Sequence, residues 1–266
     1  MKARLALIGI SVLAVSVLQI SAAEKELTLD QVRQRHLENF LGDVPPEGMM
    51  APRLLSGISA MKILDGGTGL VQGTMKFRTA PDAALLLLQF DSQGYPRDGF
   101  RLKEDGTVLP IEVSPGSAGF LAGFIDSYRF VVRSGLFGSV LSTSWPFLKS
   151  DPGIQMQFKG EKKVDKQKLL HVECGFEAGM KSDVYFDPKT FRHVRTVHRI
   201  PPDRGNAYLT EEFENFQKVG PVELPVLWRL TVEWRGNRRI LYEIGVQNIQ
   251  SPPPEEGEDE QAIRSR

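Results

Sequence analysis

The sequence contains a single cysteine, Cys174, and it lacks the motifs of the common enzyme classes. One thiol cannot form a disulfide within the chain, and a small buried strand residue is the ordinary role of such a cysteine. The patterns HExxH, paired CxxC, GxSxG, GxGxxG and the Walker loop are all missing. We therefore predict that the protein is not an enzyme and that it carries no cofactor and no metal.

An excess of charge of either sign is also absent, since 33 lysines and arginines balance 33 aspartates and glutamates. Such a balance gives no general attraction to nucleic acid or to anionic membranes. We predict no nucleic-acid partner, and peripheral membrane contact at most. Arginines do gather in the C-terminal half, where they form either a solvated sheet face or a docking surface for anionic headgroups or an acidic protein. These are Arg192, Arg195, Arg199, Arg204, Arg229, Arg235, Arg238 and Arg239.

The histidines do not form a recognisable metal or catalytic set. His193 and His198 are separated by an odd number of positions on one predicted strand, so their side chains should point to opposite faces. The same holds for His171 and Cys174. Side chains on opposite faces cannot bind one metal ion together. Ser142, Ser144 and Asp151 have no spacing that predicts a catalytic triad with these histidines.

Residues 1–23 have the three parts of a secretory signal peptide. Lys2 and Arg4 precede an apolar run over residues 5–20, and Ser21-Ala22-Ala23 forms a small-residue cleavage site. A retained membrane anchor is the alternative, but the run is shorter than the roughly 20 residues of a spanning helix. We predict cleavage after Ala23 and export to the periplasm.

The remaining chain predicts one domain over residues 24–250, because no linker divides it. Residues 251–266 are acidic, rich in proline and poor in apolar side chains, which predicts a disordered, solvated tail. A tail that binds a partner is the other interpretation.

The apolar spacing changes from helical to strand-like along the domain. Residues 27–41 predict an amphipathic helix with Thr28 as N-cap, and residues 52–62 a second, short helix. Alternating or continuous apolar runs joined by turn residues then predict consecutive hairpins. The predicted strands are residues 69–78, 83–90, 100–103, 108–113, 155–159, 169–176, 183–187, 193–200, 208–217, 227–234 and 240–250.

An apolar insertion interrupts these hairpins near residues 117–147. Phe120, Phe124, Tyr128 and Val131 follow helical spacing, and Gly135 and Gly138 loosen the pattern. A segment with so many apolar residues either fills the core or covers an apolar cavity. Together the patterns predict a mainly β (α+β) fold, a strongly curved antiparallel sheet with helices on its concave face.

The second half resembles a known family. Tyr185-Phe186-Asp187 follows the turn and strand that begin at Lys162, and Thr190 to Thr196 starts the next strand. Phe213-Glu214-Asn215-Phe216-Gln217-Lys218-Val219-Gly220 and Val222-Glu223-Leu224-Pro225 complete the run. This pattern is similar to that of the periplasmic carriers that sort outer-membrane lipoproteins, the LolA-type fold. Residues 135–146 suggest an uncharacterised bacterial branch, and the resemblance extends from about Gly67 onward.

The resemblance implies an unclosed β-barrel whose helices cover an apolar cavity, and a role in carrying or sensing acyl chains. Its partners would be a lipid or the acyl chains of a lipoprotein, together with envelope transport proteins, and the carrier would be a monomer. The long apolar insertion departs from the well-characterised carriers, and no acyl-contacting arginine can be aligned. We therefore do not extend the family's role in lipoprotein delivery to this protein. The rival hypothesis is a non-catalytic assembly or interaction module of the envelope without a small-molecule ligand.

The predicted cavity wall consists of large apolar side chains on the inner sheet face and on the insertion, each of which could equally be plain core. They are Phe77, Leu86, Leu88, Phe90, Phe120, Phe124, Tyr128, Leu136, Trp145, Met156, Phe158, Phe186 and Trp228.

Overall fold

The computed structural model describes residues 27–42, 44–45, 48, 50–67, 69–148, 153–176, 179–200, 207–219, 222–234 and 238–251. The predicted signal peptide, most of the predicted tail and the turn at Gly236-Asn237 lie outside these residues.

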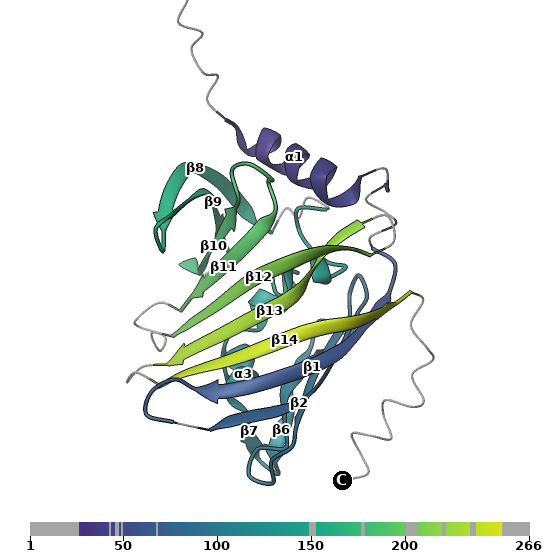
Figure 1. Cartoon of the computed structure of the whole chain (residues 1–266), viewed down its shortest axis with the longest axis vertical. Coiled ribbons are helices and arrows are strands. Elements are labelled where there is room, and N and C mark those ends of the chain that lie inside the picture. The colour runs from purple at the N-terminus through teal and green to yellow at the C-terminus, as the bar shows by residue number, and fades with distance from the viewer. Residues whose placement is uncertain are drawn as a thin grey trace, which may run out of the picture.

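One antiparallel sheet dominates the fold (Figure 1). Its strand order is β5-β4-β3-β2-β1-β14-β13-β12-β11-β10-β9-β8, so the edge strands β5 and β8 are not paired with each other and the sheet is not closed. The strands are β1 (Arg53–Ile63), β2 (Leu70–Thr79), β3 (Ala84–Phe90), β4 (Arg97–Leu102), β5 (Val108–Pro110), β8 (Gln155–Val164), β9 (Gln167–Gly175), β10 (Lys181–Phe186), β11 (His193–Arg199), β12 (Tyr208–Val219), β13 (Val222–Trp234) and β14 (Arg238–Gln250). This arrangement confirms the predicted mainly β class and the unclosed sheet.

The hairpin turns have the chemistry that their residues predict. Asp165 and Lys166 join β8 to β9 with positive φ values of 45° and 73°, as a tight hairpin turn requires. Gly106, at φ 78°, closes the turn between β4 and β5, and the Asp105 carboxylate accepts the Thr107 N–H at 2.8 Å. Local sequence therefore fixes the order of the hairpins.

The first predicted helix is confirmed as α1 (Leu29–Leu41). Thr28 is its N-cap, and its side chain and that of Gln31 bind each other's backbone N–H in a capping box. In Figure 1 this helix crosses one end of the sheet, above β8 to β13.

The short helix predicted over residues 52–62 is wrong, because this segment is strand β1. It pairs with β14 on one side and with β2 on the other, at the middle of the sheet. Leu55, Ser59 and Met61 lie on its buried face while Ile58 and Lys62 are exposed. Two neighbouring strands supply the backbone hydrogen bonds, and this tertiary pairing overrides a weak local preference.

The apolar insertion lies behind the sheet in Figure 1, and we call residues 120–148 the cap. The small hairpin of β6 (Glu112–Ser114) and β7 (Ser117–Ala118) leads into it. The cap contains α3 (Phe120–Ser127), α4 (Arg129–Arg133) and a single 3-10 turn, η1 (Ser139–Leu141). The predicted helical segment is thus confirmed up to Arg133, but it is divided into two short helices at Tyr128, whose φ of −133° and ψ of 46° are not helical. The glycines follow the end of α4.

Candidate functional site

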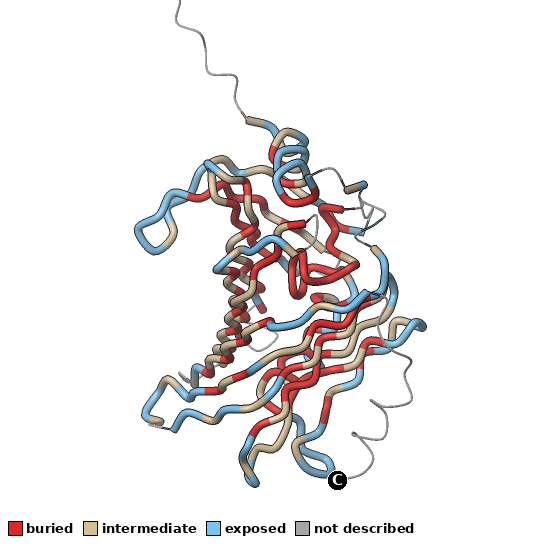
Figure 2. The backbone as a smooth tube through the Cα atoms, turned by 45° about the vertical axis from the view of Figure 1, so that its right-hand side comes forward, coloured by how far each residue is buried: buried red, intermediate tan, exposed pale blue. Residues whose placement is uncertain are grey.

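The residues predicted to line a cavity belong to one buried core or pack against it. Figure 2 shows the buried stretches of the backbone in red. Phe120, Met156 and Phe158 are half-buried, whereas each of the other ten side chains is at most 7% exposed. They contact one another: the rings of Phe77 and Trp228 are 5.7 Å apart, and those of Phe124 and Tyr128 are 5.2 Å apart. The structure therefore brings the predicted set together as packed core, and their contact with a ligand stays a prediction.

A small hollow lies beside this core, under α1. Its volume is about 10 Å³, room for about one water molecule. His36 of α1, His193 of β11 and Val140 of the cap line it, together with Arg192 and Glu223. The hollow thus lies where α1, the sheet and the cap meet.

A buried carboxylate joins the sheet to the cap. Glu211 on β12 is 0% exposed, and it accepts the Trp228 indole N–H at 3.1 Å and the backbone N–H of Gly138 at 2.9 Å. It also accepts the Nε2 hydrogen of His198 at 2.8 Å, and the other nitrogen of this ring lies 2.7 Å from the Ser182 hydroxyl. Serine, histidine and glutamate are the groups of a hydrolytic triad, but here all three are at most 1% exposed. The arrangement fixes the cap and offers no path for a substrate.

Two further histidines contact the cap. The Nδ1 hydrogen of His36 is donated to the Phe191 carbonyl oxygen at 2.9 Å, so its Nε2 is free to accept the Trp145 indole N–H at 3.2 Å. His193 donates its Nε2 hydrogen to the Arg195 carbonyl oxygen at 2.8 Å, and its Nδ1 is bonded to the Ser139 hydroxyl.

Both rings are neutral at pH 7. Burial lowers the pKa of His36 to about 4, although its hydrogen bond to Phe191 acts in the opposite direction. Burial also lowers the pKa of His193 well below its usual value, and the neighbouring His36 adds to the shift.

The prediction that His193 and His198 face opposite sides of the sheet is wrong, since both lie on the inner face. The pairing of β10 with β11 shifts between Tyr185 and Phe186, where Tyr185 pairs with Arg195 and Phe186 with His193. The extra residue of this bulge returns His193 to the inner face. His171 and Cys174 do lie on opposite faces: His171 stacks on Tyr185 and binds Asp183, whereas Cys174 belongs to the core.

Other contacts fix the two ends of the cap. Asp98 on β4, which is 0% exposed, accepts the backbone N–H groups of Leu121 and Ala122 at 3.0 and 2.9 Å, the usual anion position at a helix N-terminus. The hydroxyls of Thr79 on β2 and Thr143 lie 2.6 Å apart.

Ser142 and Ser144, whose spacing predicts no triad, have backbone partners: Ser142 accepts the Ser144 N–H, and Ser144 donates to the carbonyl oxygens of Ala80 and Pro81. The third residue of that set, Asp151, lies outside the described residues. Groups of three or more possible metal ligands are absent from the residues that the structure describes.

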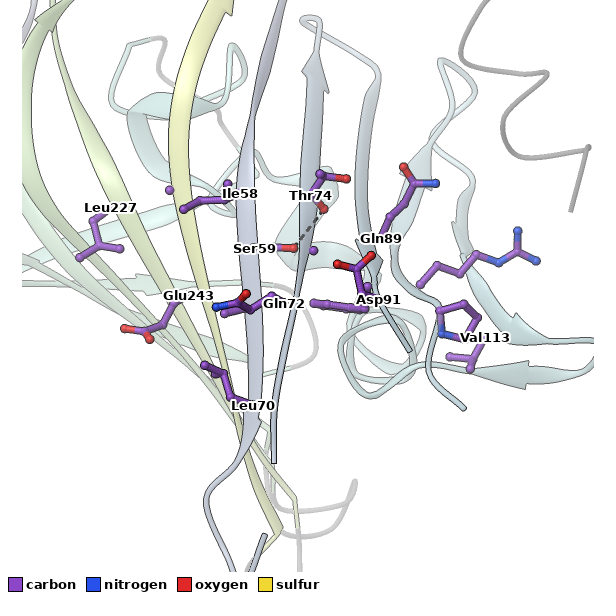
Figure 3. A pocket seen from close by; sticks show the side chains of 16 residues that line it. Ile58, Ser59, Leu70, Gln72, Thr74, Gln89, Asp91, Val113, Leu227 and Glu243 are labelled. Carbon is purple, nitrogen blue, oxygen red and sulfur yellow. Dashed lines mark hydrogen bonds between the residues drawn. The ribbon is translucent and has the colours of Figure 1, made fainter. Parts of the chain in front are cut away.

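The outer face of the sheet carries an open depression of about 1010 Å³ (Figure 3). One row of register partners crosses it, from Leu227 through Gly245, Ile58 and Thr74 to Gln89. Gly245 has no side chain, which leaves space in the middle of this row, and the Ile58 side chain lies over that position. Of the predicted cavity residues, only Phe90 lines this depression. We call it the outer depression.

A comparison with solved structures finds the same fold. A LolA superfamily protein from Nitrosomonas europaea matches with a TM-score of 0.51 and 9% identity, over 88% of this chain and 97% of that one. The chain has the LolA-type fold.

Two more distant structures match over similar lengths. A DUF1329 family protein from Desulfovibrio piger has a TM-score of 0.46 and 10% identity, over 86% of this chain and 95% of that one. A domain assigned to outer-membrane lipoprotein sorting, from Vibrio parahaemolyticus, has a TM-score of 0.45 and 12% identity, over 87% of this chain and 99% of that one. No family model matches the sequence. No curated protein matches it either.

In this LolA-type fold the apolar interior reaches the surface at one rim. Phe130 of α4 and Phe176, which follows β9, have ring centroids 4.7 Å apart. Both are half-buried, as are Met156 and Phe158 on the edge strand β8 and Met180 ahead of β10. We call these five residues the apolar rim.

The arginines of the C-terminal half that the structure describes are paired with acids. Arg192 binds Glu223, Arg199 binds Asp183, and Arg229 lies between Glu214 and Glu243. Arg195 and Arg239 are paired as well. This pairing supports the interpretation as a solvated sheet face; Arg204, Arg235 and the side chain of Arg238 lie outside the described residues.

Among the described residues no helix is long and apolar enough to cross a bilayer.

Proposed function

We propose that this protein is a periplasmic carrier for an acyl chain of a lipid or lipoprotein, and that the chain binds between sheet and cap when the cap moves outward. The supporting observation is the way in which the inner face is covered. Residues 134–148 lie against it, contain no charged side chain and form no strand pairing with it. Discrete side-chain contacts hold the segment, and these can be broken without taking the sheet apart.

The energies of this exchange are of similar size. Seven apolar side chains leave the core when residues 134–148 move outward, namely Leu136, Phe137, Val140, Leu141, Trp145, Phe147 and Leu148, all at most 6% exposed. Exposing them costs on the order of 14 kcal/mol at about 2 kcal/mol each. An acyl chain with about 15 methylenes gains roughly 12 kcal/mol on burial. The cap therefore stays closed alone, and burial of a long chain offsets most of the cost of opening it.

The apolar rim is the place where the chain enters. It is continuous with the core, and its side chains are already partly exposed. The outer depression suits an acyl chain less well, because it is open to water and Asp91, Arg97 and Glu243 are among its lining residues. A chain lying there would remain partly hydrated and gain less free energy.

Export to the periplasm is part of the proposal, and it rests on the signal-peptide pattern of residues 1–23. The second candidate function is a non-catalytic interaction module of the envelope. The closely packed core favours it, since a solid interior needs no ligand.

Titration with a fluorescent hexadecanoic acid tests the proposal. Native mass spectrometry of protein purified from the periplasm measures whether a lipid is bound. We expect one binding site per chain and a co-purified lipid. Met156→Glu, in the apolar rim, should weaken binding at least tenfold, whereas Ile58→Glu in the outer depression should not change it. The reverse pattern would place the ligand in the outer depression, and bare protein that binds no probe would favour the interaction module.

A further inference from the structure

Three imidazoles lie against one short, uncharged stretch of the cap. His36 of α1 accepts the Trp145 indole N–H, His193 of β11 is bonded to Ser139, and His198 shares Glu211 with Gly138. The proposed carrier has to release this same stretch. Histidine is the side chain whose charge changes most readily between pH 5 and 8.

We infer that His36 and His193 form an acid-sensitive latch, in which protonation of the two rings releases residues 138–145 from the sheet. The inference rests on the proposed function only in assigning the released cap to a carrier, because release itself needs no ligand.

A second proton on His36 can bind only the nitrogen that now holds Trp145. Its Nδ1 already holds a hydrogen, which it donates to the Phe191 carbonyl oxygen, so a second proton must bind Nε2. That nitrogen is the acceptor for the Trp145 N–H. After protonation two N–H donors face each other in the core, and Trp145 loses its only acceptor among these contacts. A buried donor without a partner is destabilising.

His193 follows the same logic. Its Nε2 hydrogen is held by the Arg195 carbonyl oxygen and the Thr196 hydroxyl, so the second proton enters at Nδ1. The Ser139 hydroxyl, which now donates to that nitrogen, has to rotate away or become an acceptor. Trp145 stacks on this ring with centroids 4.8 Å apart, so both histidines act on the same indole.

The charged groups around the two rings do not offset the new charges. From the sheet, Arg192 and Glu223 reach the hollow beside His36, and they are already paired with each other. Arg53 of β1 is buried and donates to the Val140 carbonyl oxygen, which places another cation at the cap. On α1, Arg33 binds the Phe147 carbonyl oxygen and Arg35 lies over the Phe191 ring. The cap itself brings no charge over residues 134–148.

His198 differs from the other two because Glu211 is its direct partner. A carboxylate stabilises an imidazolium, so a proton on His198 does not oppose the closed cap. The latch therefore consists of the two histidines whose partners are all neutral.

Hydrogen–deuterium exchange of the ligand-free full chain tests the latch. Peptides over residues 134–148 are followed at pH 7.5 and pH 5.0, after correction for the intrinsic exchange rate. We expect protection in these peptides to fall at least tenfold at pH 5.0, while peptides from β12 to β14 keep theirs. Equal protection at both pH values would overturn the inference.

Two variants separate the latch from a general acid effect. Glutamine can donate and accept hydrogen bonds but does not titrate, so His36→Gln leaves only His193 to take up a proton and should keep the cap clearly more protected at pH 5.0 than it is in the wild type. His171→Gln is the matched control, because His171 lies on the outer face and does not touch the cap. It should open like the wild type. Opening of His36→Gln at the unchanged pH would overturn the inference.

If the cap of His36→Gln is open at both pH values, the variant cannot test the latch, and the wild-type protein is used instead. Its histidine signals, followed by NMR with labelled imidazoles, should show His36 titrating at the pH at which the cap opens, and separate midpoints would refute the latch. An acid-opened cap without any acyl binding would refute the carrier alone, whereas acyl binding with a cap that ignores pH would refute the latch alone.

Discussion

The carboxylate of Glu211 accepts the backbone N–H of Gly138 at 2.9 Å, inside the molecule and between two segments 73 residues apart in sequence. Gly138 has φ 81°, so its N–H is presented by a left-handed backbone turn. A side chain there would meet the Phe77 ring at 3.1 Å. Glycine is thus required both for the turn and for the close approach to Phe77. The hydrogen bond to Glu211 attaches this part of the cap to strand β12.

Replacing this carboxylate should destabilise the protein strongly. In Glu211→Gln one acceptor oxygen becomes an amide donor, which faces either the His198 N–H or the N–H groups of Gly138 and Trp228. Each buried donor that is left without an acceptor costs about 1 to 3 kcal/mol. Urea unfolding measures the loss, and Glu212→Gln is the matched control. Glu212 is its outward-facing neighbour and is paired with the Arg195 guanidinium, so the control should lose less than about 1 kcal/mol. Equal losses in the two variants would contradict the role given to Glu211.

Two glycines of the cap should respond to alanine in opposite directions. Gly135 has φ 71°, and a Cβ atom there would lie 1.8 Å from the Ser144 carbonyl oxygen. Gly135→Ala should therefore cost at least about 2 kcal/mol from strain and a forced backbone shift. Gly123 lies in α3 with open space around the position, so Gly123→Ala should stabilise by up to about 1 kcal/mol. Thermal unfolding of both variants checks the signs, and a tolerated Gly135→Ala would show that the 135–144 contact is not fixed.

Asp98 should control the start of α3. Asp98→Asn replaces one acceptor oxygen by an amide donor. The oxygen lost is either Oδ1, which accepts the Ala122 N–H, or Oδ2, which accepts from the Leu121 N–H and the Tyr242 hydroxyl, so we expect a loss of at least about 2 kcal/mol. Asp126→Asn in the same helix breaks only an exposed ion pair with Arg129 and should change little. Exchange protection of residues 120–127 provides the measurement, and unchanged protection in Asp98→Asn would contradict the assignment.

Stability should fall with acid in a defined window. The folded-state pKa of His36 is about 4, below the ordinary value of 6.5, so the unfolded chain binds more protons between these values. The folded state is therefore stabilised above pH 6.5 and loses that stabilisation as pH falls toward 4. Urea unfolding from pH 7.5 to 4.5 should show a shallower decline in His36→Gln than in the wild type. Parallel curves would contradict the neutral buried ring.

Much of the fold follows from local sequence. The hairpins are encoded by turn residues such as Asp105-Gly106 and Asp165-Lys166, and α1 by Thr28 and its capping partner. These signals act within a few residues, so they can be read without knowing the fold. The glycines that follow α4 belong to the same group.

The errors have a different physical origin. Strand β1 is decided by β2 and β14, which lie on either side of it but are not both near in sequence. The face of His193 is decided by one bulged residue, and strict alternation cannot reveal a bulge. The spacing of Glu211, His198 and Gly138 carries no local signal either, since the sheet brings them together. Their polar character within apolar strands was the one available hint.

The claim that the cap leaves the sheet to admit an acyl chain is tested most directly by a reversible lock. Thr79→Cys/Thr143→Cys places two thiols where two hydroxyls are 2.6 Å apart, and the native Cys174 is fully buried. Thr210→Cys/Thr231→Cys, a directly opposed pair on β12 and β13, joins strands without touching the cap and serves as the control. Uptake of the fluorescent hexadecanoic acid should disappear in the oxidised cap lock, return on reduction, and persist in the oxidised control. Full uptake by the oxidised cap lock would contradict the account.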